Sequence, residues 1–191
     1  MAQIRTITVI GAGIRGREIA QICALGGFRT ILEDILPATL RQAEDEIRSA
    51  FQRAIGAGEL TRAQADAALA RIEYASSVEQ AAREADLVIE AVPEELESKI
   101  EIFTLLDKVA RPATILASSS TSCTISELAS VTYREGNVLG MRFWTSANGT
   151  ELLELVRGKR TDAETIALSS DAARKMGVGL MVTDEVLLSE S

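Results

Sequence analysis

Short apolar runs alternate with longer segments of helical periodicity along most of the chain. Residues 4–10 (IRTITVI) are rich in β-branched side chains and lead into a glycine, which is typical of a buried strand. Residues 14–25 have helical composition and end before two consecutive glycines, a common signal for a helix C-terminus. The same reasoning predicts further strands at 30–32, 87–89, 114–117, 138–144, 152–156 and 178–182. It predicts further helices at about 96–109, 125–129 and 162–176, and a short helix capped by Ser77 and Gln80.

The segment 38–70 shows helical periodicity with no strand inside it. Gly56 and Gly58 interrupt the first helix, and Thr61 with Gln64 forms a capping box for a second, alanine-rich one. This pattern predicts a helical hairpin at about 38–70, inserted between strands. The apolar positions of its first helix recur at three- or four-residue spacing: Leu40, Ala43, Ile47, Phe51 and Ala54.

The order of these elements favours a single α/β domain. Strands that alternate with helices usually form a mostly parallel sheet with helices on both faces. A chain of 191 residues has the length of about one domain and can bury a core of its own. We therefore predict a doubly wound, Rossmann-type domain over residues 1–191, with the helical hairpin as an insertion.

A glycine fingerprint lies between the first predicted strand and the first predicted helix. Gly11, Gly13 and Gly16 form the pattern G-x-G-x-x-G. In this context the first glycine permits a tight turn, the second lets a pyrophosphate approach the backbone, and the third allows close packing of helix and strand. The N-terminus of the helix favours the negative charge of the phosphates. The motif predicts a dinucleotide-binding site.

An acidic pair ends the second predicted strand. Asp34 lies 23 residues after Gly11, where a carboxylate can accept hydrogen bonds from the hydroxyls of the adenosine ribose. Glu33 adds a second negative charge, and we expect both side chains to face that ribose. Two acids would repel a 2′-phosphate, so the pair favours NAD over NADP.

Charge and composition exclude several other functions. Asp and Glu outnumber Lys and Arg by 28 to 20, and this balance disfavours nucleic acids and anionic membranes as partners. No apolar run reaches the roughly 18 residues of a membrane span. Cys23 and Cys123 match no metal or redox spacing, so we expect no metal and a reducing, cytoplasmic location. The chain contains no histidine, which removes the commonest general base.

Several longer motifs occur along the chain: VIGAGIRGREIAQ, GELTRAQADAALARI, DLVIEAVPEELESKIEIF, TILAS, GMRFW and LLELVRGK. Together they resemble the NAD-binding domain of the L-3-hydroxyacyl-CoA dehydrogenase family. The resemblance spans about residues 4–184 and implies NAD as cofactor and an acyl-CoA as second ligand. It implies oxidation of a 3-hydroxyacyl thioester to its 3-keto form, with Glu94 and Lys99 at the cofactor and Glu154 at the position that orients the catalytic base.

The chain departs from the family pattern where the chemistry takes place. Arg142 occupies the position of the family's general-base histidine, and an arginine keeps its proton at neutral pH. Ser119 and Thr121 stand where the family has an asparagine and a serine that hold the substrate oxygen. The family's C-terminal helical domain, which forms the dimer and half of the substrate cleft, is absent from this sequence.

Four features of the predicted site allow two interpretations each. Glu154 is either a surviving catalytic acid–base group or an ion-pair partner of Arg142. Lys99 either contacts the nicotinamide ribose or is a solvated lysine on its helix. The hydroxyl-rich run 118–122 either binds a substrate oxygen or forms a solvated turn, and Cys123 is either functional or a small buried residue.

Two functions therefore remain open from the sequence. The chain is either an NAD-dependent oxidoreductase of the hydroxyacyl-CoA dehydrogenase type or a non-catalytic NAD-binding protein. Without the helical domain, we expect an exposed apolar patch near Phe143, Trp144 and Leu152. We expect either a homo-oligomer whose interface covers this patch or a longer chain that covers it internally.

Overall fold

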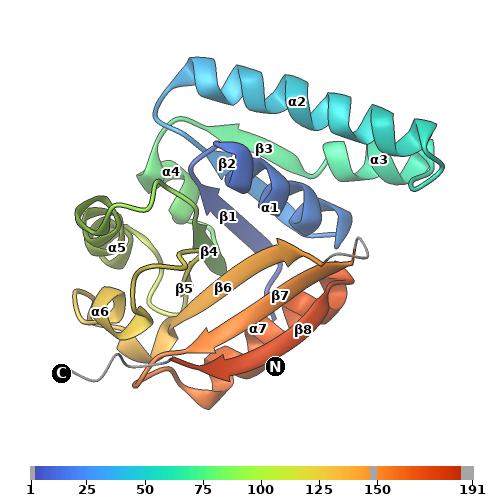
Figure 1. Cartoon of the computed structure of the whole chain (residues 1–191). Coiled ribbons are helices and arrows are strands. Elements are labelled where there is room, and N and C mark those ends of the chain that lie inside the picture. The colour runs from blue at the N-terminus through green and yellow to red at the C-terminus, as the bar shows by residue number, and fades with distance from the viewer. Residues whose placement is uncertain (1–2, 147–149, 186–191) are drawn as a thin grey trace.

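The computed structural model describes residues 3–146 and 150–185, which form one eight-stranded sheet with helices around it (Figure 1). The strands are β1 Thr6–Ile10, β2 Arg29–Glu33, β3 Ile72–Ala75, β4 Leu87–Glu90, β5 Ile115–Ser118, β6 Val138–Thr145, β7 Glu151–Arg157 and β8 Gly179–Asp184. The helices are α1 Ile14–Leu25, α2 Pro37–Gly56, α3 Arg62–Leu69, α4 Val78–Ala82, α5 Leu96–Val109, α6 Ile125–Ala129 and α7 Ala163–Met176, with a short 3-10 turn at Glu135–Asn137.

The strand order is β3-β2-β1-β4-β5-β6-β7-β8, so the chain reverses its direction of growth between β1 and β4. All neighbouring strands are parallel except β6 and β7, which pair antiparallel. Open α/β sheets bind ligands outside the carboxyl ends of the strands at such a reversal. The predicted doubly wound, mostly parallel sheet is confirmed.

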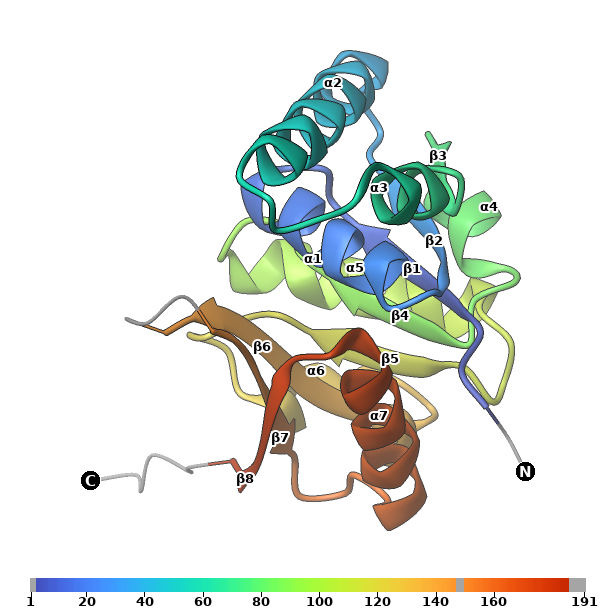
Figure 2. The same cartoon turned by 90° about the vertical axis from the view of Figure 1, so that its right-hand side faces the viewer.

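Helices cover both faces of this sheet (Figures 1 and 2). Helix α1 contacts α3 and α7 on one face, while α4, α5 and α6 contact one another in sequence on the other. Successive side chains of β1 separate accordingly, because neighbours in a strand point to opposite faces. Val9 packs in the core under α1, and Ile10 packs in the core under α4 and α5.

The helical hairpin predicted at 38–70 is present as α2 and α3, which lie next to each other in Figure 1. Helix α2 begins with Pro37, a residue suited to the first helical position. The capping box of α3 is also present: Thr61 Oγ1 accepts from Gln64 N at 3.2 Å, and Gln64 Oε1 accepts from Thr61 N at 2.9 Å. The apolar stripe of α2 is buried at Leu40, Ala43, Ile47 and Phe51.

The sequence analysis did not predict one of the strands. Strand β3 is four residues long and pairs only with β2 at the edge of the sheet. It alternates a buried Ile72 with an exposed Glu73, and its length leaves little periodicity to detect. The bounds of α1, α5 and α6 agree with the prediction, and the other elements differ from it by a few residues at their ends.

The predicted apolar patch near Phe143 is wrong. Phe143 is 5% exposed within the core under α1 and α7, and Trp144 and Leu152 are half-buried. Helix α7 covers the face of these strands that carries Phe143. Trp144 and Leu152 pair with each other on the opposite face, where each is half-buried. Among the described helices, none combines the length and the apolar character required to cross a membrane.

Candidate dinucleotide site

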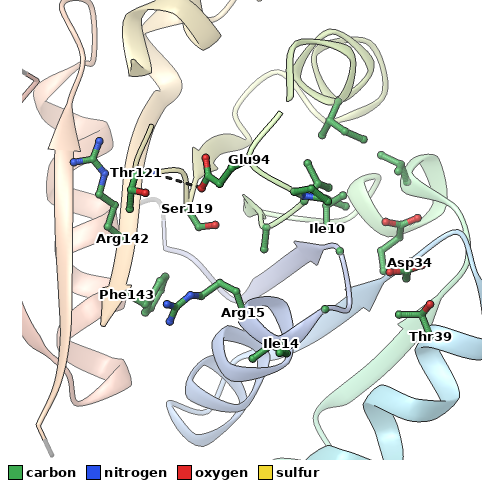
Figure 3. A pocket seen from close by; sticks show the side chains of 18 of the residues that line it. Ile10, Ile14, Arg15, Asp34, Thr39, Glu94, Ser119, Thr121, Arg142 and Phe143 are labelled. Atoms are coloured by element: carbon green, nitrogen blue, oxygen red, sulfur yellow. Dashed lines mark hydrogen bonds between the residues drawn. The ribbon is translucent and has the colours of Figure 1, made fainter. Parts of the chain in front are cut away.

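A cavity of about 1040 Å³ opens at the carboxyl ends of the parallel strands. Figure 3 shows its two ends: Asp34 and Thr39 lie on one side, and Arg142, Thr121 and Ser119 lie on the other. The glycine loop after β1 runs between them. The cavity therefore brings together the cofactor and catalytic residues that the sequence predicted, with the exception of Gly16 and Lys99, which do not line it.

Glycine is suited to each of the three fingerprint positions for a different structural reason. Gly11 has φ +97°, a left-handed conformation that favours glycine. A Cβ atom on Gly16 would lie 1.8 Å from the carbonyl oxygen of Gly11, so only glycine permits this contact of helix and loop. A Cβ atom on Gly13 would meet no atom within 4 Å, because it would point into open space. That open space above the N-terminus of α1 fits the pyrophosphate of a dinucleotide.

Asp34 joins the loop that follows β2 to the glycine loop. Its Oδ2 accepts a hydrogen bond from Ala12 N at 3.1 Å, and its Oδ1 accepts one from Leu36 N at 2.9 Å. A carboxylate has about four acceptor positions, so two remain for ribose hydroxyls. The position of Asp34 in the cavity fits the role predicted for it.

Glu33 does not stand beside Asp34 as a second exposed charge. It is the last residue of β2 and is 2% exposed, on the face covered by α4 and α5. Burial, together with the negative charges of Asp34 and Glu79, raises the pKa of Glu33 to about 7. The expectation that both acids face the ribose is corrected for Glu33, because consecutive residues at a strand end point in opposite directions.

Glu94 lies in the loop between β4 and α5 and binds the hydroxyl-rich run. Its carboxylate accepts hydrogen bonds from Ser120 Oγ at 2.6 Å, Ser122 Oγ at 2.7 Å and Thr121 N at 3.4 Å. Partial burial opposes ionisation, but these bonds and the charge of Lys99 lower the pKa of Glu94 below its ordinary value. Glu94 therefore fixes the loop that follows β5 against the loop that follows β4.

A second acid, Glu90, lies wholly inside the protein together with Lys99. Both side chains are 0% exposed, and Lys99 Nζ donates to Glu90 Oε1 at 2.7 Å. Glu90 also accepts from Val92 N at 2.8 Å and from Ser118 Oγ at 2.6 Å. The interpretation of Lys99 as a solvated surface lysine is wrong, whereas its contact with the cofactor stays a prediction. Sequence reasoning missed Glu90, although an acid ending a strand nine residues before a lysine is a usable signal.

Two of the five residues in the hydroxyl-rich run 118–122 are inaccessible to solvent. Ser118 and Ser120 are 0% exposed and are bonded to Glu90 and Glu94 respectively. The solvated-turn interpretation therefore fails for these two residues. Ser119 and Thr121, the predicted substrate contacts, line the cavity instead (Figure 3).

Arg142 and Glu154 face each other across the antiparallel pair of β6 and β7. Arg142 Nη1 lies 3.6 Å from Glu154 Oε2, and Arg142 Nε donates to Ser120 O at 2.9 Å. Glu154 also accepts from Thr183 Oγ1 at 2.7 Å. The sequence-based interpretation of Glu154 as a partner of Arg142 is thus confirmed as a contact. An arginine at this position can hold an oxygen or a carboxylate, but it cannot accept a proton.

Neither cysteine takes part in this cavity. Cys23 and Cys123 are both buried free thiols, and for Cys123 this agrees with its interpretation as a small buried residue. Burial raises the pKa of the Cys23 thiol above its ordinary value, so this thiol is unreactive. Within residues 3–146 and 150–185, no group of three or more acidic or cysteine side chains is placed to hold a metal ion.

The reversed strand order, the glycine loop after β1 and the acid after β2 define a dinucleotide-binding domain of the Rossmann class. A family model described as "3-hydroxyacyl-CoA dehydrogenase, NAD binding domain" matches residues 6–186. The chain belongs to this family, and NAD is its cofactor.

Relatives with assigned names agree with this family. The chain is 35% identical over 175 residues to a probable 3-hydroxybutyryl-CoA dehydrogenase of Bacillus subtilis, a match that covers 92% of this chain and 61% of that protein. It is 34% identical to the 3-hydroxybutyryl-CoA dehydrogenase of Bradyrhizobium diazoefficiens over 96% of this chain and 62% of that one. The crystal structure of (S)-3-hydroxybutyryl-CoA dehydrogenase from Ralstonia eutropha matches with a TM-score of 0.91 at 32% identity, covering 96% and 65%.

Proposed function

We propose that this chain is the NAD-binding domain of an oxidoreductase that acts on 3-hydroxyacyl-CoA thioesters. The observation that carries the proposal is the single cavity that joins the glycine loop and Asp34 to Ser119, Thr121, Arg142 and Glu154. The chain spans about three-fifths of the length of the two 3-hydroxybutyryl-CoA dehydrogenases from Bacillus subtilis and Bradyrhizobium diazoefficiens, so activity and substrate are proposals for the whole protein. NAD, when bound, exchanges a hydride with the substrate carbon.

The residues of this chain would divide the work between the two ends of the cavity. Asp34 would hold the adenosine ribose, and the N-terminus of α1 behind Gly13 would hold the pyrophosphate. Ser119 and Thr121 would orient the substrate oxygen. Glu94 would keep these two residues in place, because it binds Ser120 and Ser122 on either side of Thr121.

Arg142 supports a second candidate function, a non-catalytic NAD-binding protein. Its guanidinium lies where the family has its proton acceptor, forms an ion pair with Glu154 and donates a hydrogen bond to Ser120 O. The chain contains no histidine, so no side chain that lines the cavity can supply an imidazole as the base in place of Arg142. Glu154 would then be the remaining proton acceptor near the substrate position, and its carboxylate is already paired with Arg142.

A turnover assay of the parent chain and an Arg142→His variant separates the two functions. The substrates are NAD and 3-hydroxybutyryl-CoA, and NADH formation is followed at 340 nm, roughly the absorbance maximum of the reduced cofactor. Activity in the parent supports the oxidoreductase. Activity gained only by Arg142→His shows an intact substrate pocket without its base, which supports the non-catalytic protein. Absence of NAD binding in both proteins would overturn both functions.

We also propose that the protein is cytoplasmic and forms a homo-oligomer. Two free buried thiols are typical of a reducing compartment. Strand β8 lies at the edge of the sheet and exposes Met181 and Val182 by 48% and 44%, which makes it a more suitable contact surface than the buried Phe143. Sedimentation velocity at micromolar concentration tests the oligomer, and a monomer would contradict it.

A further inference from the structure

One carboxyl group in the cavity lacks a hydrogen-bond partner. Glu33 is 2% exposed, and its Oε1 is buried without a partner among the residues that the structure describes. A buried acceptor left unpaired costs free energy, so native proteins rarely keep one without a reason. The fold is able to satisfy a buried acid on this face, because Glu90 on β4 receives three hydrogen bonds there.

The surroundings of Glu33 are apolar and belong to the cavity. Ile10 from β1, Val78 from α4, Ala91 after β4 and Ile102 from α5 line the cavity together with Glu33. Apolar side chains with a single polar group among them suit a flat aromatic ring that carries one hydrogen-bond donor. A rotation about the last side-chain bond of Glu33 turns either carboxyl oxygen toward such a ring.

The position of Asp34, the residue after Glu33, indicates which aromatic ring of the dinucleotide would lie beside Glu33. Asp34 lies directly after Glu33 and, under the function proposed above, holds the hydroxyls of the adenosine ribose. The purine is bonded to the same ribose, so it must lie within one sugar of Asp34. The apolar part of the cavity beside Glu33 is within this reach.

We propose that the carboxyl group of Glu33 accepts a hydrogen bond from the exocyclic amine of adenine and thereby selects an amino-substituted purine in the dinucleotide. This inference rests on the proposed function, in which Asp34 holds the adenosine ribose of NAD. A carboxyl group keeps an acceptor oxygen whether it is protonated or ionised, so recognition does not require a charged Glu33. The high pKa of Glu33 reduces its repulsion of Asp34 and of the pyrophosphate at neutral pH.

The test compares NAD with its hypoxanthine analogue, in which a ring carbonyl replaces the amine. At about pH 9 Glu33 is ionised and can only accept, so in the parent chain the carbonyl would face an acceptor oxygen. We expect calorimetric titration at this pH to show about tenfold weaker binding, the effect of roughly one lost hydrogen bond. In Glu33→Gln the side-chain amide has the same shape and offers both a donor and an acceptor. We expect this variant to bind both dinucleotides with a ratio near one.

A matched control is Glu79→Gln. Glu79 is an exposed acid on α4 whose charge also acts on Glu33, and it does not line this cavity. We expect Glu79→Gln to keep the tenfold preference for NAD. Equal binding of the two dinucleotides by the parent, or an unchanged preference in Glu33→Gln, would overturn the inference while leaving NAD binding intact. Failure of the parent to bind NAD at all would instead overturn the proposed function.

Discussion

Glu33 and Glu90 occupy the same row of the sheet and have opposite surroundings. Ile10 on β1 aligns with Glu33 on β2 and with Glu90 on β4, so the two acids flank it on the same face. Both are at most 2% exposed. Glu90 is bonded to Lys99, Ser118 and a backbone N–H, whereas Glu33 has an unpaired oxygen and the negative Asp34 as its neighbour.

The difference separates the two halves of the candidate site. The half built on β4 and β5 satisfies its own buried charge, and this network supports the loops that carry Glu94 and Thr121. In the half built on β2, one carboxyl oxygen of Glu33 at the wall of the cavity has no hydrogen-bond partner among the described residues. Buried polar groups normally have hydrogen-bond partners. Glu90 in the first half finds its partners within the protein, whereas Glu33 in the second half would find one in a bound ligand.

The largest expected effect comes from removing the cation that satisfies Glu90. Lys99→Met keeps most of the side-chain volume but leaves Glu90 as a buried charge without its counter-ion. We expect the free energy of unfolding to fall by about 3–5 kcal/mol, the usual cost of breaking a buried pair on one side. Urea denaturation followed by circular dichroism measures this change.

Lys108→Met on the same helix is the control, because Lys108 is exposed near the end of α5. We expect it to cost less than about 1 kcal/mol. Adding Glu90→Gln to Lys99→Met should recover part of the loss, because it removes the uncompensated charge. If Lys99→Met were as stable as Lys108→Met, Lys99 would not stabilise the buried Glu90, and the contrast between Glu90 and Glu33 would be contradicted.

The second effect is a pH dependence that Glu33 should confer. Its pKa rises from 4.5 to about 7 on folding, so the unfolded chain ionises first. The stability that the neutral Glu33 provides is therefore present at low pH and is lost as the pH rises toward 7. Glu33→Gln cannot ionise, and between pH 5 and pH 8 its stability relative to the parent should increase by about 2–3 kcal/mol.

Thermal or urea unfolding at several pH values without nucleotide measures this change. Glu79→Gln serves again as control: the pKa of Glu79 is lowered, chiefly by a hydrogen bond from Ser77, so neutralising it should not stabilise the protein at high pH. A constant difference between Glu33→Gln and the parent from pH 5 to pH 8 would show that Glu33 is ionised throughout, like an ordinary exposed acid.

The sequence predicted the parts of the site that depend on local backbone geometry. The turn at Gly11, the close contact at Gly16 and the acid after β2 each follow from a few neighbouring residues, and the structure contains them. The hairpin of α2 and α3 was predictable for the same reason, because its apolar stripe and its capping box are local.

Burial across the sheet was not predictable in this way. Glu33 was expected to face the ribose, and Lys99 was expected either to contact the nicotinamide ribose or to be solvated, whereas both side chains are buried. Their burial depends on how α4 and α5 pack over β1, β2 and β4, and those segments lie far apart in the chain. Phe143 was misjudged for a related reason, since α7 follows it by about twenty residues and covers it.

Asp34 provides an intermediate effect that tests the adenosine half directly. Asp34→Ala removes the acceptor for the ribose and two bonds to the loops around it. We expect NAD binding to weaken by about 1–3 kcal/mol, the typical cost of losing a hydrogen bond to a charged acceptor. NADP is the matched ligand: its 2′-phosphate is repelled by Asp34, so its affinity should not fall in the variant. Equal losses for NAD and NADP in calorimetric titration would mean that Asp34 only supports the loop.

The smallest expected effect concerns Glu154, whose ion pair contrasts with that of Glu90. Glu154 and Arg142 are 19% and 26% exposed, and their charged atoms are 3.6 Å apart. Glu154→Gln keeps an acceptor for Thr183, and Arg142 keeps its bond to Ser120 O. We therefore expect a loss of at most about 1 kcal/mol in urea unfolding, smaller still at high salt.

A double-mutant cycle with Arg142→Gln isolates the attraction between the two side chains. A coupling as large as the loss expected for Lys99→Met would contradict the comparison, because it would make Arg142 and Glu154 a second structural pair. A coupling below about 1 kcal/mol means that the pairing of β6 with β7, and not their attraction, holds these side chains in place. The strands would then keep Glu154 in position when Arg142 is replaced by histidine, as the turnover assay requires.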